Sequence, residues 1–132
     1  MNKLVFVVVF ALALSGCAAI NSVKTLTGAS VTPSEVYVAG NTFVALEATA
    51  TQYLNLSYCP SASKVCKTQE GVNAIVPAIR AARAAVSAME NYASANPGSV
   101  VPVSLYTTAT TSISALQTAL TQYNIQAEKS AS

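Results

Sequence analysis

The chain contains no histidine, no aspartate and no tryptophan, and only 9% of its 132 residues are charged. Without histidine, a zinc site loses its commonest nitrogen ligand and serine loses its usual activating base. The acidic residues are five scattered glutamates, of which Glu35 and Glu70 are expected to serve at helix starts. A glycosidase-type pair would need two such carboxylates to converge in a cleft. We therefore expect no catalytic residue, no metal ligand and no enzymatic activity.

The longest apolar run stands at the N-terminus. Leu4 to Leu14 is an uninterrupted stretch of eleven apolar residues, and Lys3 precedes it. This is the pattern of a signal peptide, and it is short for a transmembrane helix, which needs about 20 apolar residues. The run closes with Leu14-Ser15-Gly16-Cys17. The pattern predicts a cleaved signal peptide over residues 1–16, and a plain secretory signal ending near Ala18-Ala19 is the alternative.

Leu14-Ser15-Gly16-Cys17 resembles the lipobox of bacterial lipoproteins. The resemblance implies cleavage before Cys17 and covalent attachment of diacylglycerol and an N-acyl group such as palmitate to that cysteine. This lipid would be the only group bound covalently, and we expect no other cofactor. Ala18 stands where inner-membrane lipoproteins of enteric bacteria typically carry aspartate. The resemblance therefore implies an outer-membrane lipoprotein facing the periplasm.

The three cysteines fit the same compartment. An odd count in an exported protein needs an explanation, and lipidation of Cys17 would leave Cys59 and Cys66 as one pair. A disulfide closing this eight-residue loop would stabilise the fold by about 2.5 kcal/mol through loop entropy. A metal or redox pair is the alternative, but the spacing is not Cys-x-x-Cys. We expect a structural disulfide.

The chain also lacks an excess of either charge. Loss of Lys3 with the signal peptide would leave six basic residues against five acidic ones. Nucleic-acid binding needs a concentrated basic face, so we expect no nucleic-acid partner. Arg80 and Arg83 are interpreted as a solvated helix face. A surface rich in Ala, Ser and Thr needs little desolvation to meet a partner, which favours oligomerisation or a position close to the bilayer.

Three amphipathic helices are expected after a flexible tether over residues 17–32. The first runs from about Pro33 to Ser57, with a capping box in Thr32-Pro33-Ser34-Glu35. The second follows Thr68 as N-cap and ends at Asn96-Pro97-Gly98. The third begins between Pro102 and Ser104. Apolar or small residues recur every three or four positions in each, which predicts one buried stripe per helix.

The predicted fold class is therefore all-α, a three-helix up-down-up bundle over residues 33–128 with a disordered tail at 129–132. Pro77 predicts a kink at residues 73–77, or a short helical turn before the main helix. Residues 99–103 are expected to lie as an extended strap on apolar surface. Repeated threonines make a strand over residues 100–113 the alternative to the start of the third helix.

Tyrosines are the remaining candidates for recognition, because their rings can be buried at one end and wet at the other. Tyr53 and Tyr123 fall on the predicted stripes and are expected in the core. Four others lie near helix ends and are either partner-binding residues or caps of the bundle ends: Tyr37, Tyr58, Tyr92 and Tyr106.

The sequence thus predicts a small membrane-anchored envelope lipoprotein whose bundle is a non-catalytic interaction module in the periplasm. Its expected partners are the membrane, through the lipid, and either an envelope protein or another copy of itself. The chain loosely resembles small helical lipoproteins of bacteria and prophages, on the lipobox, the Thr-Pro-Ser-Glu helix start, the Cys59/Cys66 pair and Gln-Tyr-Asn-Ile at 122–125. Two alternatives follow: a phage-encoded lipoprotein acting in superinfection exclusion or lysis, and a self-assembling structural component of the envelope. An apolar-ligand carrier is a third, which would need a cavity among the Ala-rich faces.

Overall fold

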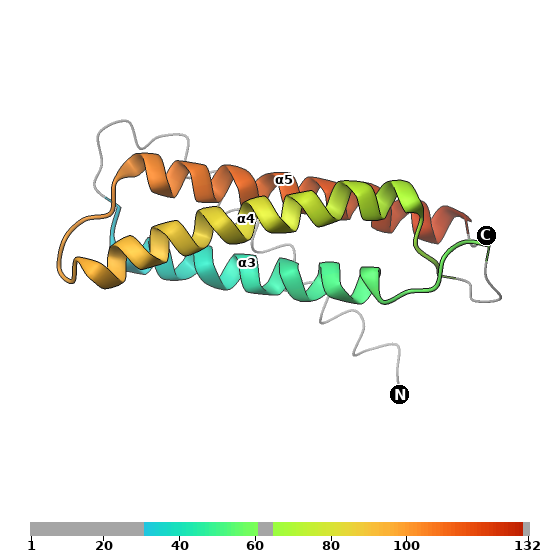
Figure 1. Cartoon of the computed structure of the whole chain (residues 1–132), viewed down its shortest axis with the longest axis horizontal. Coiled ribbons are helices and arrows are strands. Elements are labelled where there is room, and N and C mark those ends of the chain that lie inside the picture. Colours follow the sequence, from blue (N-terminus) through green and yellow to red (C-terminus); the bar gives the residue numbers. More distant parts are fainter. Residues whose placement is uncertain (1–30, 61–64, 131–132) are drawn as a thin grey trace. The chain divides into compact units, whose positions relative to one another are not determined.

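The computed structural model describes residues 31–60 and 65–130, and only the backbone of residues 124–130. The expected signal peptide, Cys17 and the tether up to Ser30 lie outside the described residues. Three helices follow one another along the described chain, and all three pack against each other. Figure 1 shows each helix running opposite to the one before it, which is the up-down-up order. The predicted all-α three-helix bundle is confirmed.

The first helix, α3 (Pro33–Leu54), begins with the predicted capping box. The Glu35 carboxylate accepts hydrogen bonds from the Thr32 N–H at 2.7 Å and from the Thr32 hydroxyl at 2.8 Å. The Glu35 N–H donates to the Thr32 side chain in return. The helix ends at Leu54, with Asn55 as C-cap, and not near Ser57 as expected. The predicted core positions of this helix are buried or half-buried: Val36, Gly40, Phe43, Leu46, Ala50, Tyr53 and Leu54.

A cross-linked corner joins α3 to α4. Cys59 and Cys66 form the predicted disulfide, with their Cα atoms 5.3 Å apart. The Lys67 N–H donates to Ser57 O at 2.9 Å, and the Cys59 N–H donates to Lys67 O at 3.1 Å. The Lys67 ammonium donates to the carbonyl of Leu54, where α3 has no basic residue in its last turn. A positive group at a helix C-terminus is favourable. Lys67 of the corner therefore provides the basic group that is missing from the last turn of α3.

The second helix, α4 (Gln69–Ala95), is capped by Thr68 as predicted, whose hydroxyl accepts from the Gly71 N–H at 3.0 Å. It is continuous through Pro77, so of the two alternatives predicted there, a kink or a separate short turn, the separate turn is wrong. Packing of the buried, opposite face of α4 offsets the hydrogen bond that this exposed proline removes. The buried side chains are Ile75, Ile79, Ala82, Val86 and Met89.

A turn and a short strap connect α4 to α5. The Ser99 N–H donates to Asn96 O at 3.0 Å, and Gly98 takes a φ of 81°, which only glycine adopts without strain. The Val101 N–H then donates to Val31 O at 3.4 Å, and both valines are buried. Val100 and Val103 remain exposed. The strap prediction therefore holds only in part, for the buried Val101 and the half-buried Pro102. Successive side chains of an extended segment point to opposite sides, so Val100 faces away from the core.

The third helix, α5 (Val103–Ser130), is continuous, and the strand alternative over residues 100–113 is wrong. The helix persists two residues into the tail that we expected to be disordered from residue 129. Its threonines satisfy their hydroxyls within the helix, as Thr108 does on Ser104 O at 2.8 Å and Thr118 on Ser114 O at 2.9 Å. Packing of the apolar stripe outweighs the weak helix propensity of threonine. That stripe includes Tyr106, Ala109, Ile113, Leu116 and Leu120.

One ion pair crosses the bundle surface. The Arg83 guanidinium of α4 binds the Glu47 carboxylate of α3, with Nε donating to Oε1 at 2.9 Å. The two residues lie 36 positions apart, and the Arg83 side chain is 60% exposed. Such exposed pairs contribute about 0.2–1 kcal/mol. Arg83 thus faces solvent as expected, but it also links two helices, which the local pattern did not reveal.

Candidate functional site

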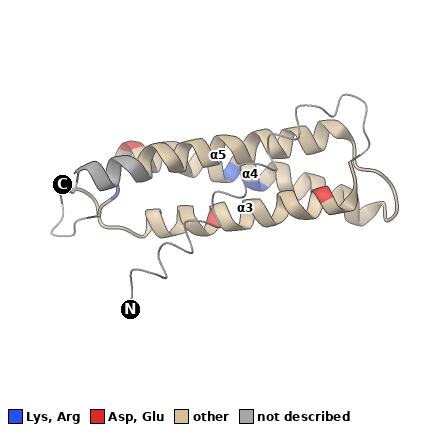
Figure 2. Ribbon diagram, turned by 180° about the vertical axis from the view of Figure 1, so that it is seen from behind, with Lys and Arg blue, Asp and Glu red and all other residues tan. Residues whose placement is uncertain are grey.

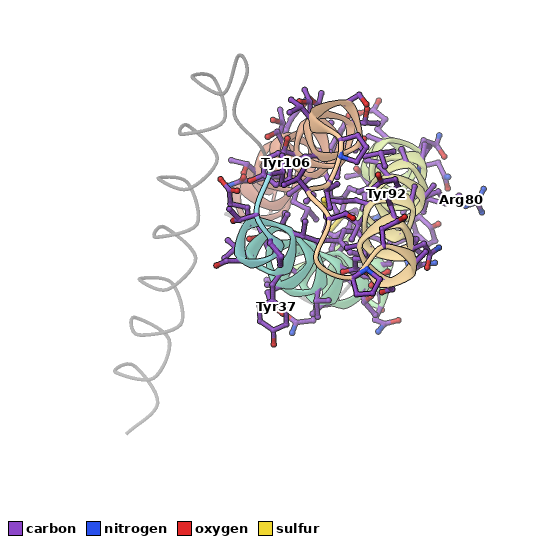
Figure 3. All side chains as sticks on the ribbon, turned by 90° about the vertical axis from the view of Figure 1, so that its left-hand side faces the viewer. Tyr37, Arg80, Tyr92 and Tyr106 are labelled. Carbon is purple, nitrogen blue, oxygen red and sulfur yellow. A yellow bond between two sulfur atoms is a disulfide. The ribbon has the colours of Figure 1, made fainter. Side chains whose placement is uncertain are left out.

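The four candidate tyrosines do not form one site. Tyr37, Tyr92 and Tyr106 belong to the end of the bundle where α3 and α5 begin and α4 ends, whereas Tyr58 lies in the cross-linked corner at the other end. Figure 3 looks onto the first of these ends and shows Tyr37 projecting away from α3. Tyr37 is 72% exposed and Tyr58 is 49% exposed, whereas Tyr92 is half-buried. Each exposed ring therefore presents a separate surface.

Tyr106 belongs to the core. It is only 7% exposed, which removes it from the predicted partner-binding set and places it among the residues that cap the bundle end. Burial, and secondly the nearby Glu35 carboxylate, raise the pKa of the Tyr106 phenol. Both causes act because a phenolate would be poorly solvated and would repel the carboxylate. Tyr53 is buried as expected, and Tyr123 is half-buried.

Tyr58 is fixed by its neighbour. The Lys67 ammonium lies 4.7 Å from the centroid of the Tyr58 ring, a cation–π contact. The disulfide and the two backbone hydrogen bonds around Lys67 hold this contact in place. Tyr58 is thus an exposed ring beside the disulfide, while Tyr37 is an exposed ring on a helix.

The described carboxylates do not converge. Glu35 is held in the capping box and Glu47 by Arg83, and Glu70 and Glu90 stand on exposed turns of α4. Within residues 31–60 and 65–130, no group of three metal-binding side chains comes together. None of the described helices is long and apolar enough to cross a membrane.

The described side chains of α5, from Val103 to Tyr123, form an uncharged face. No lysine, arginine or glutamate occurs from Asn91 to Ala127, and Figure 2 shows how few and scattered the charges are along the described helices. A shallow depression of about 400 Å³ lies on α5 against Gln117, Thr118, Thr121 and Gln122. The hydroxyls of Thr118 and Thr121 donate to carbonyls of their own helix. The face therefore presents mostly methyl and methylene groups, with little polar surface to desolvate.

Exposed apolar side chains gather at the bundle end that contains Val31. We define the Val31 end as residues 31–32, the first two turns of α3, the last turn of α4 and residues 96–103. It carries four of the large hydrophobic side chains that are exposed in the described chain: Tyr37, Val38, Val100 and Val103. The others are Val44, Tyr58 and Val65. Sequence reasoning identified only Tyr37, since it placed the valines of the strap against the core.

No protein-family model matches the chain, and comparisons with curated proteins and with solved structures give no significant match.

Proposed function

We propose that this chain is a small envelope lipoprotein, anchored through Cys17 to the outer membrane, whose bundle is a non-catalytic interaction module in the periplasm. The observation that carries the proposal is Leu14-Ser15-Gly16-Cys17 at the end of an eleven-residue apolar run. A disulfide in so small a domain is typical of an oxidising compartment, which agrees with export.

The described bundle supports an interaction role more than a chemical one. Its described carboxylates are engaged or scattered, and the described side chains of α5 present an uncharged face. A surface that loses little hydration on contact suits binding to another protein. A phage-encoded lipoprotein that blocks a receptor or assists lysis is one version of this module.

The intact mass of the protein from the membrane fraction tests the anchor. We expect a chain that begins at Cys17 and carries acyl mass. Cys17→Ser should be unlipidated and lost from the membrane fraction, whereas Cys59→Ser, which removes a cysteine in the folded domain, should remain lipidated and membrane-bound. A Cys17→Ser variant retained in the membrane would contradict the proposal.

A self-assembling envelope component is the second candidate, and the uncharged face of α5 favours it. Sedimentation of the detergent-solubilised protein separates the two. A stable homo-oligomer that Thr111→Lys or Thr118→Lys dissociates would support self-assembly, since both residues are exposed on α5. A monomer at all concentrations would leave an unlike partner as the target of the module.

A further inference from the structure

Val31 is where the chain enters the bundle, so its position decides which end of the bundle lies closest to an N-terminal lipid anchor. Val31 is fully buried and is hydrogen-bonded through its carbonyl to the Val101 N–H. If Cys17 carries the lipid, as the proposed function requires, residues 18–30 separate the lipid from Val31. The flexible tether expected from the sequence would span about 20 Å root-mean-square over this length. The 22 residues of α3 span about 33 Å, so the Val31 end is held near the bilayer and the cross-linked corner is held farther away.

The exposed side chains of the Val31 end suit contact with lipid. Tyr37 and Val38 are 72% and 48% exposed on α3, and Val100 on the strap and Val103 at the start of α5 are also exposed. Tyrosine is enriched at membrane–water interfaces, where its ring sits among the headgroups and its hydroxyl stays hydrated. Single exposed valines are ordinary on a protein surface. Packing of the core does not explain why several exposed apolar side chains gather at the Val31 end.

The charge of the Val31 end indicates which kind of lipid it suits. Its charged neighbours in the described chain are Glu35, held by Thr32, and Glu90 on α4. The nearest described cation along α4 is Arg83, twelve residues before Ala95 and so about 18 Å from the helix end. A polybasic attraction to anionic headgroups is therefore missing from this end.

We propose that the Val31 end is a lipid-contacting surface that rests on the zwitterionic phospholipid to which the protein is anchored. Four side chains enter the headgroup region: Tyr37 and Val38 on α3, Val100 on the strap and Val103 at the start of α5. The bundle then stands on its end, with the disulfide corner and Tyr58 directed away from the membrane. Lipid anchor and apolar end act together, because a short tether raises the local concentration of the membrane surface.

The absence of tryptophan from the chain allows a direct test. Single substitutions Tyr37→Trp, Val44→Trp and Tyr58→Trp place a fluorophore at three heights, at sites that are 72%, 61% and 49% exposed. The full-length lipidated variants, verified by mass and circular dichroism, are reconstituted into phosphatidylcholine vesicles whose acyl chains carry bromine, a contact quencher of tryptophan. Flotation with the vesicles is measured first on the same samples.

The expected result is a gradient of quenching. Tryptophan emission from the Tyr37→Trp variant should be blue-shifted and strongly quenched, most of all by bromines near the headgroups, because interfacial side chains reach only about 5–10 Å into the bilayer boundary. Quenching should be weaker at position 44 and absent at position 58. Added salt or anionic lipid should leave the pattern unchanged.

Two results would overturn the inference without touching the proposed function. Equal quenching at positions 37 and 44 in floated protein would mean that α3 lies flat on the membrane. Floated protein without quenching at position 37 would leave the Val31 end for a protein partner. Protein that carries no acyl mass and does not float would overturn the proposed anchor itself, and the inference with it.

Discussion

At the scale of single residues, two glycines show how packing decides the sign of the same substitution. A Cβ at Gly71 would lie 2.9 Å from Tyr53 Cζ and 3.1 Å from Tyr123 Cδ1, and closer still to Tyr53 Oη. Tyr53 cannot move away, because it is buried and its hydroxyl accepts from the Thr68 N–H at 3.0 Å. A Cβ at Gly40 would meet only the carboxylate end of the exposed Glu90 side chain.

Gly71→Ala should therefore lower the free energy of unfolding by about 1–3 kcal/mol through overpacking. Gly40→Ala, its matched control, should raise that free energy by about 0.5–1 kcal/mol, because alanine loses less backbone entropy in a helix and Glu90 can rotate away. Urea unfolding of both variants measures the difference. A stabilised Gly71→Ala would show that Tyr53 is not held as described.

Tyr106 gives the protein an alkaline sensitivity. Its pKa is raised in the folded state above the ordinary value of 10.0, by burial first and by Glu35 second. As the pH rises through about 10, the unfolded chain releases this proton while the folded protein retains it, so the stabilisation present below that pH is lost.

Tyr106→Phe should flatten the loss of stability that sets in as the pH rises through about 10, where the phenol of the unfolded chain titrates. Denaturant midpoints measured below and above this pH give the slopes. Parallel curves for the wild type and Tyr106→Phe would refute the assignment.

At the scale of the helices, the two helical prolines occupy opposite contexts. Pro33 stands at the first position of α3, where its fixed φ is favourable and no hydrogen bond is lost. Pro77 is exposed in the interior of α4, where it removes a hydrogen bond to Asn73 O.

Pro77→Ala should raise stability by up to about 3 kcal/mol, since it restores that hydrogen bond and relieves the ring from the carbonyl of Asn73. Pro33→Ala should lower stability by about 0.4–1 kcal/mol, because the unfolded chain gains freedom. Thermal melts of the two variants should move in opposite directions. A loss of stability in Pro77→Ala would mean that α4 packs in a shape that requires the proline.

At the scale of the whole bundle, the disulfide joins only the first corner, and the helices are held by their buried stripes. Reduction of Cys59–Cys66 should cost about 2.5 kcal/mol of loop entropy. For a domain of this size, that loss corresponds to a fall in melting temperature of about 10–20 °C. The far-ultraviolet circular dichroism below the transition should stay helical.

Lys67→Met with the disulfide intact provides the comparison for this experiment. It removes the hydrogen bond to Leu54 O and the cation–π contact with Tyr58, but it leaves the cross-link. We expect a loss of about 1–2 kcal/mol, from the helix-end contact and the charge-assisted hydrogen bond together. A reduced protein with an unchanged melting temperature would show that the cross-link contributes nothing to stability.

The sequence by itself determined the helices, since a capping box, an N-cap, a glycine turn and apolar residues three or four apart are local signals. It also predicted the disulfide pair and the three-helix class. Tertiary structure decided that α4 continues through Pro77, because packing against the other helices offsets the hydrogen bond that the proline removes. Tertiary structure likewise decided that Tyr106 is buried, that Arg83 reaches Glu47 and that Tyr37 lies at the same end as the exposed valines of the strap. These contacts join positions far apart in the chain, and their energies exist only once the helices have come together.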